Sequence, residues 1–222
     1  MNEGIDWQDI HTVFLDMDGT LLDLHFDNYF WMTYLPGHYA QKHDLELDVA
    51  RNDLFERFAA AEGSLDWYCL DYWQRELEVD IIALKQAVSH LIQVHDHVID
   101  FLDRLRRAGK RLVLLTNAHH GSLELKIEKT GIDGHFDRVI SSHSLGLAKE
   151  NSGFWEALRE IEPYDAQHSL LVDDSLPVLR NARHFGIRYL VAVRWPDTQG
   201  EERDVDEFFS VKGVEAMRSE LP

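Results

Sequence analysis

Short apolar runs and helical patterns alternate along the second half of this chain, and this alternation limits its fold more than any other feature. Apolar residues recur with helical spacing over 119–130, 153–161 and 176–185, and Gly131 and Gly186 stand where C-caps would end two of these helices. Runs typical of buried strands are Thr12–Met17, Arg111–Thr116, Phe136–Ser141, Ser169–Val172 and Ile187–Val193. Strands that alternate with helices predict an α/β protein with a parallel sheet covered on both faces.

A long segment interrupts this alternation after the first strand. About seventy residues, from roughly Leu24 to His95, precede the helix that leads to the second strand, which is too long for a simple crossover. The segment has helical periodicity and holds half of the 24 aromatic residues, which predicts a core of its own. We therefore expect a small helical cap at residues 24–95, inserted into a doubly wound, Rossmann-like core formed by residues 1–23 and 96–222.

Two smaller features complete the predicted organisation. The stretch after Trp195 contains Pro196, Gly200 and a charged run, and we expect it to be a surface extension. Cys69 is the only cysteine of the chain, which excludes an intrachain disulfide and a cage of several thiolates around a metal. We expect Cys69 to be a small core residue.

Charge and composition narrow the classes of partner. The 40 acidic and 22 basic side chains give a formal charge of -18, which argues against binding to the phosphate backbone of nucleic acids. Hydrophobic residues make up 45% of the chain, enough for a folded core. Because the chain lacks a run of roughly eighteen apolar residues, and its first residues do not resemble a secretion signal, we expect no membrane span and a cytoplasmic location.

Polar side chains collect where the predicted strands end, and the carboxyl ends of parallel strands meet at the edge of a sheet where ligands bind. These residues are Asp16, Asp18, Thr116, Asn117, Asp173 and Asp174, with Lys149 before a later helix. Four carboxylates at one edge repel each other, and a divalent cation would relieve that repulsion. Ligands that are all oxygen favour Mg²⁺, and the amine of Lys149 with backbone N–H groups at the turns would hold a phosphate.

This set of residues predicts metal-assisted phosphoryl transfer. Asp16 ends its strand and is the candidate nucleophile, forming an aspartyl phosphate that water then hydrolyses. Asp18 is the candidate acid and base, first giving a proton to the leaving group and then taking one from the water. Thr116, Asn117 and Lys149 are the candidate phosphate ligands. The candidate metal ligands are Asp16, Asp18, Asp173 and Asp174, and which of the last two binds directly stays open.

The ordered motifs resemble those of the haloacid dehalogenase superfamily of phosphohydrolases. They are FLDMDGTLL at 14–22, LLTNA at 114–118, Lys149 in GLAKE, and LLVDDS at 170–175. The resemblance implies the roles given above, with Asp18 offering its backbone carbonyl to Mg²⁺, and a cap that selects substrates. Members that cleave carbon–halogen bonds lack the second Asp of the first motif, so Asp18 favours a phosphate ester. Relatives often have proline after the lysine, whereas this chain has Glu150.

Four further segments resemble the bacterial GMP/IMP 5′-nucleotidases of this superfamily: LDLHFDNYFW at 22–31, LDWYCLDYW at 65–73, LLTNAHH at 114–120 and FGIRY at 185–189. The resemblance implies a purine nucleoside monophosphate as substrate. Aromatic side chains of the cap could stack on a purine, each stack contributing roughly 1–3 kcal/mol. Candidate specificity residues are Asp27, Asn28, Trp31, Tyr68, Tyr72 and His119. Packing in the cap, helix capping or a solvated surface would explain the same residues.

Other activities fit the same motifs. A sugar-phosphate or phosphoglycolate phosphatase would share every motif residue, and a phosphosugar mutase similar to β-phosphoglucomutase would share the nucleophile and the acid/base residue. A non-catalytic module that binds a phosphorylated ligand is the alternative of another class. The oligomeric state and the movement of the cap are open at this stage.

Overall fold

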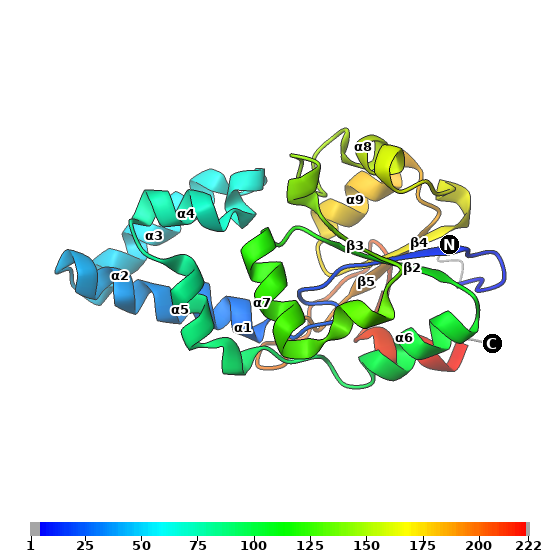
Figure 1. Cartoon of the computed structure of the whole chain (residues 1–222), viewed down its shortest axis with the longest axis horizontal. Coiled ribbons are helices and arrows are strands. Elements are labelled where there is room, and N and C mark those ends of the chain that lie inside the picture. Colours follow the sequence, from blue (N-terminus) through cyan, green and yellow to red (C-terminus); the bar gives the residue numbers. More distant parts are fainter. Residues whose placement is uncertain (1–4, 221–222) are drawn as a thin grey trace.

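A computed structural model describes residues 5–220 and contains one sheet of six parallel strands, in the order β3-β2-β1-β4-β5-β6 (Figure 1). The strands are β1 Thr12–Leu15, β2 Arg111–Thr116, β3 Arg138–Ser141, β4 Ser169–Asp173, β5 Tyr189–Val193 and β6 Phe209–Val211. The doubly wound α/β fold and the five predicted strands are confirmed. Leu15 pairs in register with Leu114 on one side and Val172 on the other, so the three strands end within two residues of one another.

Helices cover both faces of the sheet, as predicted (Figure 1). They are α6 Val98–Arg107, α7 His120–Thr130, α8 Phe154–Ile161 and α9 Leu176–Phe185. Apolar side chains of α6 and α7 pack on one face, while α8 and α9 pack on the other. Gly131 and Gly186 end α7 and α9 with φ of +64° and +107°, a conformation that glycine adopts without steric cost.

A second group of helices lies to one side of the sheet (Figure 1). These are α1 His25–Tyr29, α2 Leu35–His43, α3 Leu47–Ala61, α4 Leu70–Leu77 and α5 Ile81–Ala87, with a π-helical turn at Phe30–Tyr34. Their apolar faces form a separate core rich in aromatic rings. This supports the proposed division into a cap at 24–95 and a core at 1–23 and 96–222, whose ends at 1–4 and 221–222 lie outside the described residues.

Short 3₁₀-helical turns join several of these elements. They are Leu65–Tyr68, Ser89–Leu91, Ile132–His135, Ser142–Ser144, Ala166–His168 and Val214–Glu220. Within residues 5–220, every helix is too short or too polar to span a bilayer.

Two chain segments pass side by side between the cap and the core. Leu22 pairs antiparallel with Val94, and the backbone N–H of Asp23 donates to the Gln93 carbonyl at 2.9 Å. These paired segments are the connections between the proposed cap and core. They position α1, and with it the cap side chains, beside the carboxyl end of β1.

The stretch after Trp195 is more than the predicted surface extension, although its charged run is exposed. β6 adds to the edge of the sheet by pairing with β5. The Pro196 carbonyl accepts the N–H of Leu24 at 2.8 Å, and Asp197 accepts the side-chain amide of Asn28 at 2.7 Å. The backbone groups at the edge of β5 would lack partners without β6, and Leu24 and Asn28 offer polar groups to Pro196 and Asp197. The composition of this segment does not reveal these partners.

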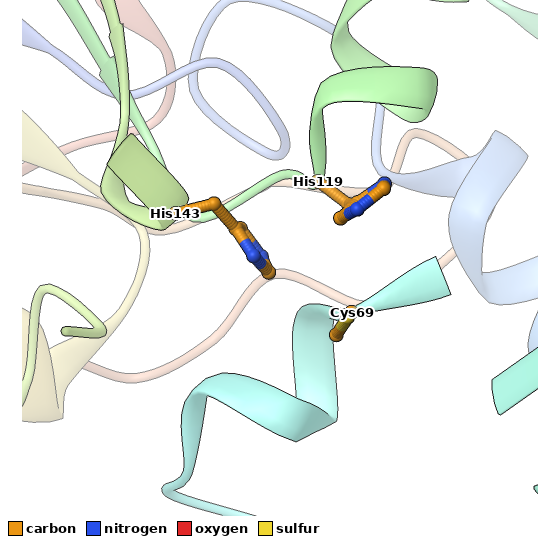
Figure 2. A group of neighbouring side chains, drawn as sticks. All are labelled: Cys69, His119 and His143. Carbon is orange, nitrogen blue, oxygen red and sulfur yellow. The ribbon is translucent and has the colours of Figure 1, made fainter. Parts of the chain in front are cut away.

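Cys69 is also placed differently from the prediction. It is half-buried at the N-cap of α4, where its Sγ accepts the N–H of Tyr72 at 3.4 Å. Its thiol faces His119 and His143 of the core rather than the apolar interior of the cap (Figure 2).

Candidate active site

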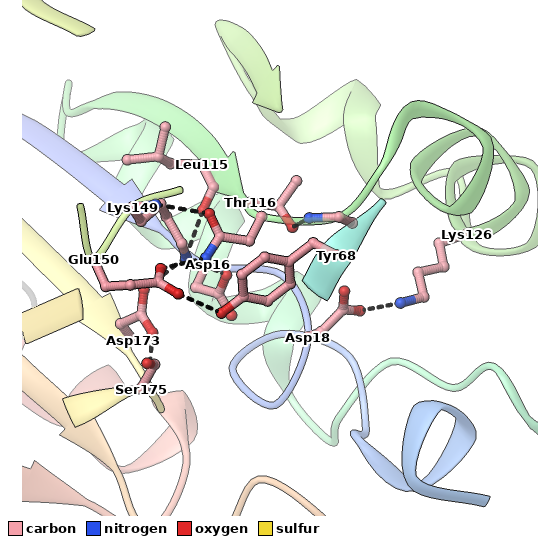
Figure 3. Close-up of polar contacts among 12 residues, drawn as sticks. Asp16, Asp18, Tyr68, Leu115, Thr116, Lys126, Lys149, Glu150, Asp173 and Ser175 are labelled. Carbon is pink, nitrogen blue, oxygen red and sulfur yellow. Dashed lines mark hydrogen bonds and ion pairs between the residues drawn. The ribbon is translucent and has the colours of Figure 1, made fainter. Parts of the chain in front are cut away.

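Three acidic side chains converge at the carboxyl edge of the sheet, and Figure 3 shows two of them, Asp16 and Asp173. Asp16 follows β1, Asp173 ends β4, and Asp174 is the next residue. One carboxylate oxygen from each lies within 4.8 Å of the others. The parallel register of β1 and β4 produces this convergence, because it brings both strand ends to the same level of the sheet.

Lys149 lies between two of these carboxylates. Its buried ammonium is 2.5 Å from Asp16 Oδ1 and 2.7 Å from Asp173 Oδ2, and it also donates to the Leu115 carbonyl at 3.1 Å. Burial alone would lower the pKa of Lys149, but Asp16 and Asp173 outweigh burial and raise it well above its usual range. The ammonium therefore keeps its charge at the bottom of the site.

Hydrogen bonds fix the loop that presents Lys149. The side-chain carbonyl of Asn117 accepts the N–H of Lys149 at 2.9 Å, and its amide donates to Glu150 at 2.8 Å. Asn181 donates to the Lys149 carbonyl at 2.8 Å. Tyr68, from the cap, donates to the other oxygen of Glu150 at 2.8 Å (Figure 3). Glu150 thus holds in place the loop that relatives often build with proline, and it also connects that loop to the cap.

The carboxylates of Asp16, Asp173 and Asp174, called the acidic group from here on, carry more negative charge than the nearby cationic side chains neutralise. Burial raises the pKa of Asp16 to about 6, with Lys149 opposing the shift and Asp173 adding to it. Burial also raises the pKa of Asp174, helped by the charge of Asp16. Among the residues that line the adjoining cavity, five carboxylates face three ammonium groups: Asp16, Asp18, Asp27, Asp173 and Asp174 against Lys85, Lys126 and Lys149. An all-oxygen set with this excess fits a hard divalent cation.

The oxygens of the acidic group are not equally available. Asp173 uses one oxygen for Lys149 and the other for the N–H of Ser175, at 2.9 Å. The Oδ2 of Asp174 lies 3.2 Å from the Nη1 of Arg203. Arg203 belongs to the exposed segment after β5, which the sequence analysis predicted to be a surface extension. Asp16 and Asp174 therefore offer the more accessible oxygens to a cation.

Gly19 leaves room for Asp174. Its φ is +85°, and a Cβ built on it would lie 2.8 Å from the Asp174 carboxylate and 2.9 Å from Pro196 Cβ. Gly131 has a similar φ of +64°, but no atom lies within 4 Å of its built Cβ.

Gly19→Ala should therefore lower turnover about 10²-fold by displacing Asp174, and should cost about 1–3 kcal/mol of stability. Gly131→Ala is the matched control: it should lose about 1–2 kcal/mol through backbone strain and keep its turnover. Steady-state phosphate release and urea unfolding of both variants check this. Equal turnover in the two variants would contradict it.

The Asp18 side chain turns away from the acidic group. Its carboxylate lies 2.7 Å from the Nζ of Lys126, a buried lysine of α7 (Figure 3). Burial raises the pKa of Asp18 to about 6, against the opposing charge of Lys126. Asp18 can thus exchange a proton near neutral pH. Its predicted role as a metal ligand would fall to the backbone carbonyl, because its side chain is not part of the acidic group.

Lys126 connects Asp18 to the cap. Its ammonium lies 2.6 Å from Asp27 of α1, and Asp27 also lies 2.7 Å from Lys85 of α5. Burial would raise the pKa of Asp27, but the two lysines outweigh burial and hold it well below its usual range. The ammonium of Lys85 sits 4.7 Å from the ring centroid of Phe30. Sequence reasoning missed both lysines.

Lys126→Met should cost about 3–5 kcal/mol of stability, because it leaves two carboxylates without their shared partner. It should also lower turnover about 10²–10⁴-fold, because Asp18 loses the contact that holds it. Lys85→Met should lose stability through Asp27 alone, with a much smaller fall in turnover. Urea unfolding and steady-state phosphate release test this pair. Equal losses of turnover would contradict a role of Lys126 at Asp18.

A cavity of about 320 Å³ lies between the cap and the acidic group. Of the predicted phosphate ligands, Thr116, Asn117 and Lys149 all line it, and Asp27, Asn28, Trp31, Tyr68 and His119 line it among the predicted specificity residues. Tyr72 does not line this cavity. It packs edge-on against Trp73, with ring centroids 4.9 Å apart.

Comparisons with known proteins agree with this architecture. The sequence model of the haloacid dehalogenase-like hydrolases matches residues 10–186. GMP/IMP nucleotidase YrfG of Escherichia coli (strain K12) is 41% identical over 198 residues, which cover 89% of each chain.

Solved structures share the fold. A phosphatase of the same superfamily from Thermococcus onnurineus superposes with a TM-score of 0.78 at 21% identity, covering 96% of this chain and 98% of the other. The hydrolase YfnB from Bacillus subtilis, solved with magnesium bound, gives a TM-score of 0.65 at 17% identity, covering 96% and 98%. The family match over most of the chain, the high identity to a curated relative and the shared fold lead to one conclusion: this protein belongs to the haloacid dehalogenase-like hydrolases.

Proposed function

We propose that this hydrolase is a Mg²⁺-dependent 5′-nucleotidase that cleaves purine nucleoside monophosphates such as GMP and IMP to the nucleoside and inorganic phosphate. The observation that carries the proposal is the meeting of Asp16, Asp174 and Lys149 at the floor of a cavity roofed by an aromatic cap. The identity of 41% to a GMP/IMP nucleotidase supports the substrate class. The cytoplasmic location expected from the sequence remains part of this proposal.

In the first step an oxygen of Asp16 attacks the phosphorus, and the bond to the 5′-oxygen of the nucleoside breaks. Asp18 gives its proton to that departing oxygen, for which its raised pKa suits it. The second step reverses this role. Asp18 takes a proton from a water that attacks the aspartyl phosphate, which frees inorganic phosphate and restores Asp16.

Positive charge and hydrogen-bond donors would hold the phosphate during both steps. Lys149 provides a fixed ammonium beside Asp16. The Thr116 hydroxyl accepts the N–H of Ala118 at 3.0 Å, which leaves its own proton for a phosphate oxygen. Mg²⁺ bound by Asp16, Asp174 and the Asp18 carbonyl would supply further positive charge to the phosphoryl oxygens. The Asn117 side chain is occupied by Lys149 and Glu150, so its phosphate contact would come from its backbone N–H.

The nucleoside would lie under the cap. Trp31 and Trp67 line the cavity as half-buried rings, and Asp27 and Asn28 line the same side. A flat purine ring can use such aromatic surfaces, at roughly 1–3 kcal/mol for each stacked base. Both carboxylate oxygens of Asp27 contact lysines, one Lys85 and the other Lys126. We therefore expect Asp27 to shape the cavity rather than to hydrogen-bond to the purine base.

The substrate proposal predicts that GMP and IMP have kcat/KM values at least about tenfold above those of pyrimidine nucleotides and sugar phosphates, because a smaller ring stacks less. Release of free phosphate measured over that panel with Mg²⁺ tests it. If a sugar phosphate has the highest value, the nucleotide assignment fails and the phosphatase chemistry stands. Transfer of the phosphoryl group to a second sugar hydroxyl would indicate a mutase. No turnover on any member would indicate a binding module.

A further inference from the structure

A second cluster of metal-ligating side chains lies apart from the acidic group. Cys69 precedes α4, His119 precedes α7, and His143 belongs to the turn at Ser142–Ser144. One ligand atom from each lies within 4.8 Å of the others, and the three side chains point into a common space (Figure 2). The nucleotidase mechanism proposed above leaves the thiol and the His143 ring unused.

His143 presents a free ring nitrogen in this space. Its Nε2 is buried and has no hydrogen-bond partner among the described residues. Burial and the nearby His119 lower the pKa of His143 to about 4. The imidazole is therefore neutral, as a metal ligand must be.

His119 and Cys69 have only weak contacts of their own. Burial lowers the pKa of His119, which favours the neutral form of this ring. Its Nδ1 accepts the N–H of Gly121 at 3.3 Å, and its Nε2 lies 3.6 Å from the exposed carboxylate of Asp71. Cys69 accepts one backbone N–H at 3.4 Å. A bound cation would replace few good interactions, and Asp71 stands close enough to supply a fourth ligand.

We propose that Cys69, His119 and His143 form a site for a transition-metal ion of the zinc type, with Asp71 or water in the fourth position. In a tetrahedral zinc site, ligand atoms lie between about 3.3 and 3.8 Å apart, given bonds of about 2.0–2.3 Å. The three ligand atoms, which lie within 4.8 Å of one another, would have to approach by about 1–1.5 Å at most. One sulfur and two nitrogens favour zinc over magnesium, whereas the acidic group offers oxygen alone. The two sites would therefore take different metals from the same solution.

The proposed metal site lies between the cap and the core. Cys69 belongs to the cap, whereas both histidines belong to the core, so the bound ion would fasten the cap to the core. His119 also lines the substrate cavity. We expect zinc to slow turnover in the presence of Mg²⁺, because cap opening and the His119 ring would both be restrained.

Cobalt titration of the full-length protein with saturating Mg²⁺ tests the site directly. The wild type should bind one Co²⁺ with a thiolate-to-metal charge-transfer band, and Zn²⁺ should displace it. Cys69→Ser should lose that band, and His143→Asn should bind at least about tenfold more weakly. His184→Gln, at an exposed histidine of α9, is the matched control and should behave as the wild type. Asp174→Asn should also keep the band, because it alters only the acidic group.

Alkylation gives an independent readout, since Cys69 is the only thiol of the chain. Zn²⁺ should protect the thiol of the wild type and of His184→Gln, and should protect His143→Asn only at higher concentration. A cobalt spectrum without the thiolate band, or equal protection in His143→Asn, would overturn the proposed site. Zinc that binds at Cys69 without slowing phosphate release would overturn the fastening of the cap.

Discussion

Asp16→Asn should lower the turnover of GMP by at least about 10⁴-fold, since removal of a nucleophile has effects of this order in other hydrolases. The amide cannot attack the phosphorus to form an acyl phosphate at a useful rate, yet it has nearly the same shape as the carboxylate. The carbonyl oxygen of that amide can still accept a hydrogen bond from the ammonium of Lys149, so the fold should persist. Phosphate release by the purified variant, measured with saturating Mg²⁺, gives the result.

The control for this prediction is the folded state of the variant. Circular dichroism and thermal unfolding should resemble those of the wild type, because Asp173 still partners Lys149 at 2.7 Å. A folded Asp16→Asn protein that keeps more than about one per cent of the wild-type turnover would remove Asp16 from the role of nucleophile. A labelled phosphoryl group trapped on the wild-type protein, and absent from the variant, would locate the intermediate.

Lys149→Met should affect both stability and turnover. It removes the ammonium that contacts Asp16 and Asp173, and leaves their buried charges without this partner. Breaking a buried ion pair from one side costs about 3–5 kcal/mol. Turnover should fall at least about 10²-fold, as expected when a group that stabilises transition-state charge is lost. Urea unfolding and phosphate release measure the two effects.

Magnesium provides a sharper test of the same substitution. A cation that binds only the folded state stabilises it, and it binds more tightly where more negative charge is uncompensated. Mg²⁺ should therefore raise the Tm of Lys149→Met more than the Tm of the wild type. Lys129→Met, at an exposed lysine of α7, should match the wild type throughout. The same magnesium response in all three proteins would contradict this electrostatic account of the site.

The strands, and the polar residues that follow them, could be predicted because both depend on local sequence. Each buried strand is a continuous apolar run, and the residues that follow it lie at the sheet edge whatever the rest of the chain does. The acidic group could be anticipated on these grounds from Asp16, Asp173 and Asp174, and the structure places them within 4.8 Å. The parallel pairing of β1 and β4 brings the residues after these strands together, as the sequence pattern predicts.

Lys85 and Lys126 could not be predicted in the same way. Both are lysines in short helices, and a helical lysine usually belongs to a solvated face. Their burial depends on Asp27, which is 58 residues from Lys85 and 99 from Lys126. Only the folded cap brings these charges together. For the same reason the sequence did not predict the hydrogen bond between Glu150 and Tyr68, which are 82 residues apart.

The segment after β5 has a practical consequence for anyone preparing this enzyme. The family match stops at residue 186, yet Asp197 bonds to Asn28 of the cap, and Arg203 reaches Asp174. A fragment cut at the end of the matched region would remove two strands of the sheet and leave the Leu24 N–H without the Pro196 carbonyl. A catalytic fragment of this enzyme should therefore extend beyond residue 186, where the match to the family's sequence model ends.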